Sequence, residues 1–529
     1  SVNRARPGTG SDNPGLVTMT SISSRCYFWG SRPLISQSSQ IRLSSFLGSA
    51  GNACACPLDE GVFSVCMVAI VRHILSAARH FVLNAPSLWG CCKALTLARM
   101  TLFFLSDSVL ATHVWCMFFL ATLGVGLLLK VWLAWRQIRH VSAHRHAVPS
   151  AFAHTVSLPA HQKAADYTVA QSRFGLLVLL YGTVLLLGWT VWGGLQVLHN
   201  LLAQWLASPM WQQLGLLAGF ALMGSLLELP LDWYRTFRLE ARFGFNTSTL
   251  GLWLGDWCKN MALGAIIGLP LGALILWLMQ QAGNLWWLWA WAVWAGFGLL
   301  MMVIYPAWIA PLFNRFEPLQ DPHLVQRVTA LMQRCGFSAK GFYVMDGSKR
   351  SAHANAYFTG LGRSKRVVFF DTLLKKLQPG EVDAVLAHEL GHFKHRHIQQ
   401  RLLLSLGLSL AGFALLGWLY EQAWFYAGLG VADALAQPHA ALALLLFMLV
   451  APVFSIFAAP IAAASSRKHE FQADAFATQH STASDLSSAL LKLYNDNAST
   501  LTPDPLYVRF YYSHPPASER LARLALAKA

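Results

Sequence analysis

The residues whose types and spacing could do chemistry are His388, Glu389 and His392, which form an H-E-x-x-H pattern. Four residues make about one helical turn, so on a helix both imidazoles would share one face and hold one tetrahedral Zn²⁺. Glu389 would then lie beside the open coordination position as a general base. An accidental match is expected on the order of once in a hundred such chains. The alternative is a solvated, histidine-rich helix, because His395 and His397 follow closely.

A two-histidine site needs a third protein ligand, and Glu470 is the best candidate for it. Asp474 follows four residues later, so on a helix it would share the face of Glu470 and could orient a zinc-bound imidazole. The ordinary alternative is that Glu470 is a surface carboxylate paired with Arg467 or Lys468. His469 is a rival ligand, but it lies one residue off that face.

The composition indicates the environment that must position these residues. Of the 529 residues, 55% are hydrophobic and only 12% are charged, against about 25% charged in a typical soluble domain. The chain also has 21 Trp and 31 Phe. This excludes an ordinary soluble enzyme and favours a protein that crosses the bilayer several times. The net charge of +16 does not predict nucleic-acid binding, because Lys and Arg lie mostly between the apolar runs.

Seven apolar runs are about 20 residues long, the length that crosses a bilayer as a helix. They lie at 112–135, 175–198, 213–231, 261–280, 286–306, 402–421 and 441–463. Connections rich in Lys and Arg alternate with connections that have none. The positive-inside rule therefore predicts that the chain enters its first span from outside and ends inside.

The spans divide the chain into five parts. We expect an atypical, disordered or extra N-terminal segment at 1–111, where Ser, Arg and Gly show no stable period and most cysteines lie. Spans one to five occupy 112–306, and spans six and seven occupy 402–463. The polar segments 307–401 and 464–529 would fold together on the cytoplasmic side. We interpret 307–401 as a catalytic insertion and 464–529 as a C-terminal catalytic segment with the third ligand.

Within the insertion we expect a helix at 322–335, strands around 341–346 and 365–371, and a helix at 378–398. Pro379 and Gly380 mark the start of this last helix, which would carry the H-E-x-x-H pattern. We expect the C-terminal segment to begin as a helix that continues the last span.

Five motifs together make the chain resemble the type I CAAX prenyl proteases over residues 117–525. They are Phe243-Gly244-Phe245-Asn246, Ile304-Tyr305-Pro306 through Asn314, Asn355-Ala356-Tyr357-Phe358, His388-Glu389-x-x-His392 and Ser466-Arg467-x-x-Glu470-x-x-Ala473-Asp474. The resemblance implies an α-helical multi-pass membrane protein with seven transmembrane helices that enclose a chamber. It also implies a small α+β zincin-like catalytic domain that binds one Zn²⁺ per chain.

The resemblance implies roles for further residues. His514 and Arg520 match a C-terminal S-H-P-P-x-x-x-R pattern of the family, and His514 would stabilise the oxyanion. Arg520 would share this catalytic role or be a partner of Glu470. Asn355 and Ala356 occupy the place of the edge strand to which a substrate peptide adds. The alternatives without a catalytic role are that His514 is a loop residue before two prolines, and that Asn355 and Ala356 belong to a core strand.

Two function classes remain. The first is a zinc-dependent endopeptidase, which either processes the C-termini of prenylated CAAX proteins or serves bacterial membrane-protein quality control. Its partners would be a peptide or protein substrate and the lipid bilayer, with no nucleic acid. We expect a bacterial inner membrane, or the ER membrane in a eukaryote, with the active site on the cytoplasmic side. The second class is a transporter or channel with a metal-binding helix, although the chain shows no internal repeat.

Overall fold

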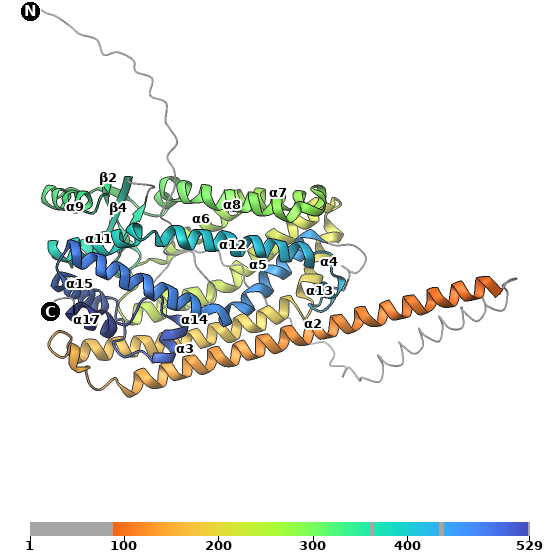
Figure 1. The fold of residues 1–529 in the computed structure, drawn as a ribbon, viewed down its shortest axis with the longest axis horizontal. Coiled ribbons are helices and arrows are strands. Elements are labelled where there is room, and N and C mark those ends of the chain that lie inside the picture. Colours follow the sequence, from red (N-terminus) through yellow and green to blue (C-terminus); the bar gives the residue numbers. More distant parts are fainter. Residues whose placement is uncertain (1–87, 360–363, 433–438, 527–529) are drawn as a thin grey trace, which may run out of the picture.

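A computed structural model describes residues 88–359, 364–432 and 439–526 of the chain. The predicted atypical segment lies outside the described residues up to residue 87. Long helices run side by side along one axis, and a small sheet with short helices gathers at one end of the bundle (Figure 1). This arrangement confirms a helical membrane protein with a small α+β part.

Seven helical stretches within the described residues are long and apolar enough to cross a membrane, which confirms the predicted number of spans. They are built from α2 (Leu88–Ala143), α3 (Leu158–Trp189), α5 (Pro209–Tyr234), α6 (Leu250–Leu263) with α7 (Leu269–Gln281), α8 (Trp286–Ile304), α12 (His397–Leu419) and α14 (Ala440–His480). Three π-helical turns, Arg235–Glu240, Gly264–Gly268 and Tyr305–Ile309, extend or join them. Pro230, Pro270 and Pro306 lie near these turns, where the missing proline N–H disturbs the helical ladder.

Three predicted boundaries differ from the observed ones. The second span ends at Trp189 rather than at 198, because Gly193 adopts φ 77° and starts a separate helix, α4 (Gly194–Trp205). The predicted helix at 378–398 is two helices, α11 (Pro379–Lys394) and α12, with Arg396 between them at φ 58°. Helix α2, which contains the first span, begins at Leu88, so the chain is already helical before the predicted boundary at residue 111.

The sheet has the order β1-β2-β4-β3 and lies among the helices of the catalytic part. Its strands are β1 (Phe316–Pro318), β2 (Ser338–Met345), β3 (Ala356–Thr359) and β4 (Ser364–Phe370). Strands β2 and β4 are parallel, and β3 runs antiparallel to β4. The predicted strands at 341–346 and 365–371 coincide with β2 and β4, and the predicted helix at 322–335 is α9 (Pro322–Arg334).

Short helices complete both ends of the molecule. They are α10 (Asp371–Leu374), α13 (Ala423–Ala427), α15 (Ala483–Asp496), α16 (Pro505–Tyr511) and α17 (Ala517–Leu526). One buried apolar core lies inside the helix bundle and includes Phe220 and Leu446. A second core joins the sheet to α11, α14 and α15 through Phe369, Leu390 and Phe476. The second core holds the end of α14 against α11.

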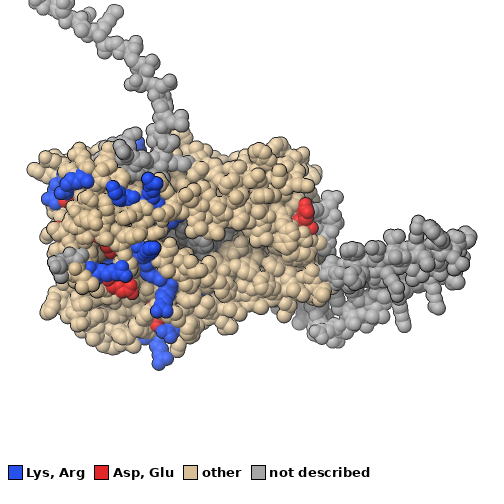
Figure 2. Space-filling view, viewed as in Figure 1, with Lys and Arg blue, Asp and Glu red and all other residues tan. Residues whose placement is uncertain are grey.

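Charge is unevenly distributed along the bundle axis. Figure 2 shows Lys and Arg on the half of the visible face that carries the sheet, whereas the opposite half shows a small acidic patch and no basic one. This is the polarity that the spacing of basic residues between the apolar runs predicts.

Candidate active site

Helix α11 begins with a complete capping box. The Gln378 backbone N–H donates to Glu381 Oε2 at 2.7 Å, and Pro379 occupies the first helical turn. Glu381 is buried and also accepts from Lys492 Nζ at 2.7 Å and from the Ser488 hydroxyl. These contacts fix the start of the helix that carries the H-E-x-x-H pattern against α15.

Helices α11 and α14 pack at very short range around Gly391. A Cβ added to Gly391 would lie 2.9 Å from Ala473 Cα, closer than real contacts allow. Ala387 and Ala473 are both fully buried. Small residues on both helices therefore let α14 approach the histidine-bearing face of α11.

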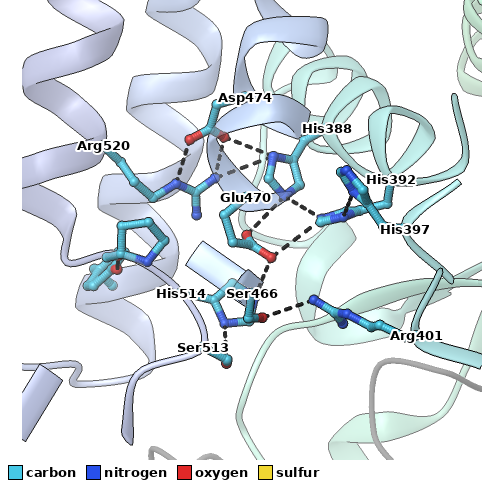
Figure 3. Close-up of polar contacts among 12 residues, drawn as sticks. His388, His392, His397, Arg401, Ser466, Glu470, Asp474, Ser513, His514 and Arg520 are labelled. Carbon is cyan, nitrogen blue, oxygen red and sulfur yellow. Dashed lines mark hydrogen bonds and ion pairs between the residues drawn. The ribbon is translucent and has the colours of Figure 1, made fainter. Parts of the chain in front are cut away.

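This packing brings His388, His392 and Glu470 together, with one ligand atom from each within 4.8 Å of the others (Figure 3). The Nε2 atoms of His388 and His392 are 3.3 Å apart. The Glu470 carboxylate lies 3.4 Å from His388 Nε2 and 3.5 Å from His392 Nε2. Glu470 is 2% exposed, and its Oε2 atom is buried without a hydrogen-bond partner. Two imidazole nitrogens and an orphaned carboxylate oxygen are a donor set that fits Zn²⁺.

The sequence alternatives for Glu470 do not occur in the structure. Arg467 instead donates to the backbone carbonyls of Val508 and Tyr512, at 3.0 and 2.8 Å. The ring of His469, the rival ligand, stacks on His397 with centroids 4.0 Å apart and is not in the three-residue group.

His388 is oriented from behind by Asp474. The Asp474 Oδ1 atom accepts from His388 Nδ1 at 2.8 Å, so the His388 Nε2 lone pair faces the other ligand candidates. Arg520 donates through Nε to Asp474 Oδ2 at 2.8 Å and through Nη2 to Oδ1. The predicted place of Asp474 beside a ligating imidazole thus agrees with the geometry. Arg520 is 5% exposed and lies beside Asp474, and its Nη2 atom is also 3.4 Å from His388 Nδ1 (Figure 3).

His392 is oriented by two residues that the sequence did not single out for this role. The Gln472 Oε1 atom accepts from His397 Nε2 at 2.9 Å, and His397 Nδ1 lies 3.0 Å from His392 Nδ1. Because an amide oxygen only accepts, the His397 proton is on Nε2 and its Nδ1 accepts from His392. The His392 Nε2 lone pair is then directed at the other ligand candidates. The i, i+5 spacing from His392 to His397 is the only sequence signal, and it crosses a helix boundary.

Glu389 is partly exposed on α11, next to the two histidines in sequence. Burial of its carboxyl raises the pKa of Glu389, and the nearby Glu470 carboxylate raises it further, against the opposing charges of His388 and Arg520. A carboxyl with a raised pKa is suited to accept and return protons near neutral pH.

His514 lies on the open side of the ligand group. Its Nε2 atom is 3.4 Å from Glu470 Oε1, and its Nδ1 atom is 3.0 Å from the Ser513 hydroxyl. The side chain is 58% exposed. A nitrogen donor therefore faces the site from the loop before Pro515 and Pro516.

Asn355 and Ala356 lie where β3 begins. The Asn355 side-chain oxygen accepts from the Ala356 N–H at 2.8 Å, and the Asn355 carbonyl accepts from the Phe370 N–H at 3.0 Å. Strand β3 is last in the sheet order and pairs with β4 alone among the described strands. Its second edge is therefore where a further strand would add.

Two family models match the chain. "CAAX prenyl protease N-terminal, five membrane helices" matches residues 137–315, and "Peptidase family M48" matches residues 318–527. Together they cover the catalytic part and the bundle except for most of α2. The chain belongs to the type I CAAX prenyl protease family.

Relatives from several eukaryotes support the same assignment. CAAX prenyl protease 1 of Saccharomyces cerevisiae is 37% identical over 59% of this chain and 71% of its own length. The CAAX prenyl protease 1 homolog of Homo sapiens is 32% identical over 75% of this chain and 93% of its own. The crystal structure of S. mikatae Ste24p matches with a TM-score of 0.72 and 30% identity, over 78% of this chain and 99% of that one.

This family membership confirms a multi-pass membrane metalloendopeptidase with a peptide or protein substrate. The comparisons do not favour a transporter or channel.

Proposed function

We propose that this protein is a zinc-dependent endopeptidase that processes the C-termini of prenylated CAAX proteins. The observation that carries this proposal is the buried Glu470 carboxylate beside His388 and His392, whose Oε2 atom has no hydrogen-bond partner. A buried polar atom without a hydrogen-bond partner is costly, and a cation bound at this place would satisfy it. The names of the relatives supply the substrate class.

His388, His392 and Glu470 would hold the ion. Bound Zn²⁺ supplies Lewis acidity and lowers the pKa of a coordinated water to about 7. Glu389 takes a proton from the attacking water and later returns it to the leaving amine, a task that its raised pKa suits. His514 donates to the oxygen that gains negative charge. Arg520 acts through Asp474 as a positioning residue, because it contacts the carboxylate behind His388.

The substrate peptide adds to the edge of β3 at Asn355 and Ala356. Main-chain hydrogen bonds to a strand edge bind an extended peptide without regard to most of its side chains. The hydrogen bonds of Asn355 to Ala356 and Phe370 hold that edge in place. Selection for a prenylated substrate would then come from the apolar bundle rather than from the strand.

We propose that the catalytic end faces the cytoplasm. The support is the gathering of Lys and Arg at that end of the bundle (Figure 2) together with the positive-inside rule. The bacterial inner membrane stays a prediction, and the relatives described above come from eukaryotes.

The test uses the full chain purified in detergent and one peptide in farnesylated and unfarnesylated forms. We expect cleavage of the farnesylated form, loss of cleavage with a chelator, and recovery with Zn²⁺. The variant Glu389→Gln should keep stoichiometric zinc and lose cleavage. Full cleavage by this variant would overturn the catalytic assignment, and equal cleavage of both peptides would overturn the CAAX assignment.

A further inference from the structure

The outer face of α14 forms one wall of a groove that the proposed reaction does not use. The groove has a volume of about 500 Å³ and lies between α14 and α17. It is lined by Ala464, Arg467, Lys468, Phe471, Gln472, Ala475 and Arg523. The lining contains three cations and no acid. On the same stretch of α14, the buried Glu470 and Asp474 are directed towards the histidines of α11.

The three cations of the groove form no ion pairs within the described part of the chain. Arg467 is bound to backbone carbonyls, and the Arg523 guanidinium lies 3.5 Å from the centre of the Phe471 ring. Lys468 is exposed. Three positive charges over an apolar floor are complementary to an anion that has an apolar part.

The groove continues a stripe of exposed apolar residues on α14. Phe457 is 48% exposed and Ile461 is 75% exposed, and both precede Ala464 and Lys468 at helical spacing. At 1.5 Å per residue, Lys468 lies about 10 Å further along the axis than Ile461. Acyl chains beside Phe457 and Ile461 would therefore place a headgroup at Lys468.

We propose that this groove binds the headgroup of an anionic phospholipid from the surrounding bilayer. The acyl chains lie along the apolar stripe of α14, and the phosphate contacts Lys468 and Arg523. A lipid fits better than a free anion, because the apolar stripe leads directly into the cationic groove.

Gln472 connects this groove to the active site, a step that rests on the proposed function. The Gln472 side chain lines the groove, and its Oε1 atom accepts from His397, which in turn contacts His392. When a lipid phosphate accepts a hydrogen bond from the Gln472 amide NH₂ group, the Gln472 Oε1 atom is held towards His397. Anionic lipid therefore favours the orientation of His392 that binds the metal.

The test compares the full chain in vesicles of phosphatidylcholine with vesicles that also contain phosphatidylglycerol. The readouts are the ratio of peptide cleavage rates in the two vesicles and the zinc retained against a chelator. We expect phosphatidylglycerol to raise the cleavage rate and the retained zinc several-fold. In the double variant Lys468→Gln/Arg523→Gln, the ratio of each quantity between the two vesicles should be close to one. The matched control Arg334→Gln/Lys375→Gln removes the same charge from exposed positions outside the groove and should keep the wild-type ratios.

A second measurement detects the lipid directly. The chain is delipidated, mixed with phosphatidylglycerol in detergent, and the lipid retained per chain is measured by mass spectrometry. We expect the groove variant to retain less than wild type and the control variant. Equal retention overturns the proposal, as does an equal effect of inorganic phosphate in phosphatidylcholine vesicles. If no vesicle supports cleavage, the proposed function fails, whereas lipid retention still decides whether the groove binds lipid.

Discussion

Asp474 binds the imidazole of His388 at 2.8 Å on the side opposite to Glu470. Both carboxylates come from α14, one helical turn apart, and they contact opposite nitrogens of the same ring. The ring is therefore held in one tautomer and one orientation before any ion binds. Arg520 neutralises the buried Asp474 and fixes its position.

This contact predicts that Asp474→Asn weakens metal binding. Loss of the carboxylate removes the acceptor that orients His388, and such partners are typically worth about 10-fold to 100-fold in metal affinity. Zinc affinity is measured by competition with a chromophoric chelator. The variant Asp383→Asn, which alters the Arg327 pair elsewhere on α11, should bind zinc like wild type.

The other histidine is expected to depend on His397. His397→Phe keeps an aromatic ring but removes the nitrogen that accepts from His392 Nδ1. We expect zinc affinity to fall about 10-fold, measured by the same competition. His395→Phe is the control, because His395 is exposed and the histidine that contacts His392 Nδ1 is His397. Unchanged affinity in His397→Phe would show that His392 needs no partner.

Gly391→Ala should destabilise the catalytic part. The added methyl group meets backbone and Cβ atoms of α14, at 2.9 Å from Ala473 Cα and 3.1 Å from Phe476 Cβ, so the two helices must separate. Overpacking of this kind costs about 1–3 kcal/mol, which a lower Tm in detergent would report. Gly407→Ala on α12 meets nothing within 4 Å and should leave the Tm unchanged or slightly raised.

His514→Ala should lower kcat more than it changes KM. A single oxyanion donor is worth about 100-fold to 1,000-fold in kcat, whereas a loop residue without a catalytic role would leave kcat intact. Zinc content should stay stoichiometric, because His514 is not among the three ligand candidates. A rise in KM alone would assign His514 to substrate binding instead.

Glu381 should make stability depend on pH in the acidic range. Burial acts to raise the pKa of this carboxyl, but its hydrogen bonds to Lys492 and Ser488 outweigh burial and lower it. Because the folded pKa lies below the unfolded one, the stabilisation is complete above the usual pKa of about 4.3 and is lost as pH falls through the lowered value. The Tm difference between wild type and Glu381→Gln should therefore shrink on acidification, and a constant difference would contradict this.

The sequence by itself determined the number of spans, the helix that carries His388 and His392, and the position of Glu470 beyond the last span. The length of an apolar run and the i, i+4 spacing are local properties of the chain, so they can be recognised from the sequence without knowledge of the fold. The second span was predicted too long, because Gly193 adopts a left-handed backbone conformation and the helix before it ends within the apolar run.

Only the tertiary structure decided the partners of each ligand. The spacing of Asp474 from Glu470 predicted that it orients an imidazole, but which histidine it contacts depends on how α14 packs against α11. Arg520, His397 and Gln472 reach the two histidines because α11, α12, α14 and α17 pack together, and contacts up to 132 residues apart leave no period in the sequence. Tertiary packing also places Arg520 behind His388, against Asp474, rather than on the open side of the ligand group. Helix periodicity states which residues share a face, whereas the packing of small residues such as Gly391 and Ala473 determines what that face meets.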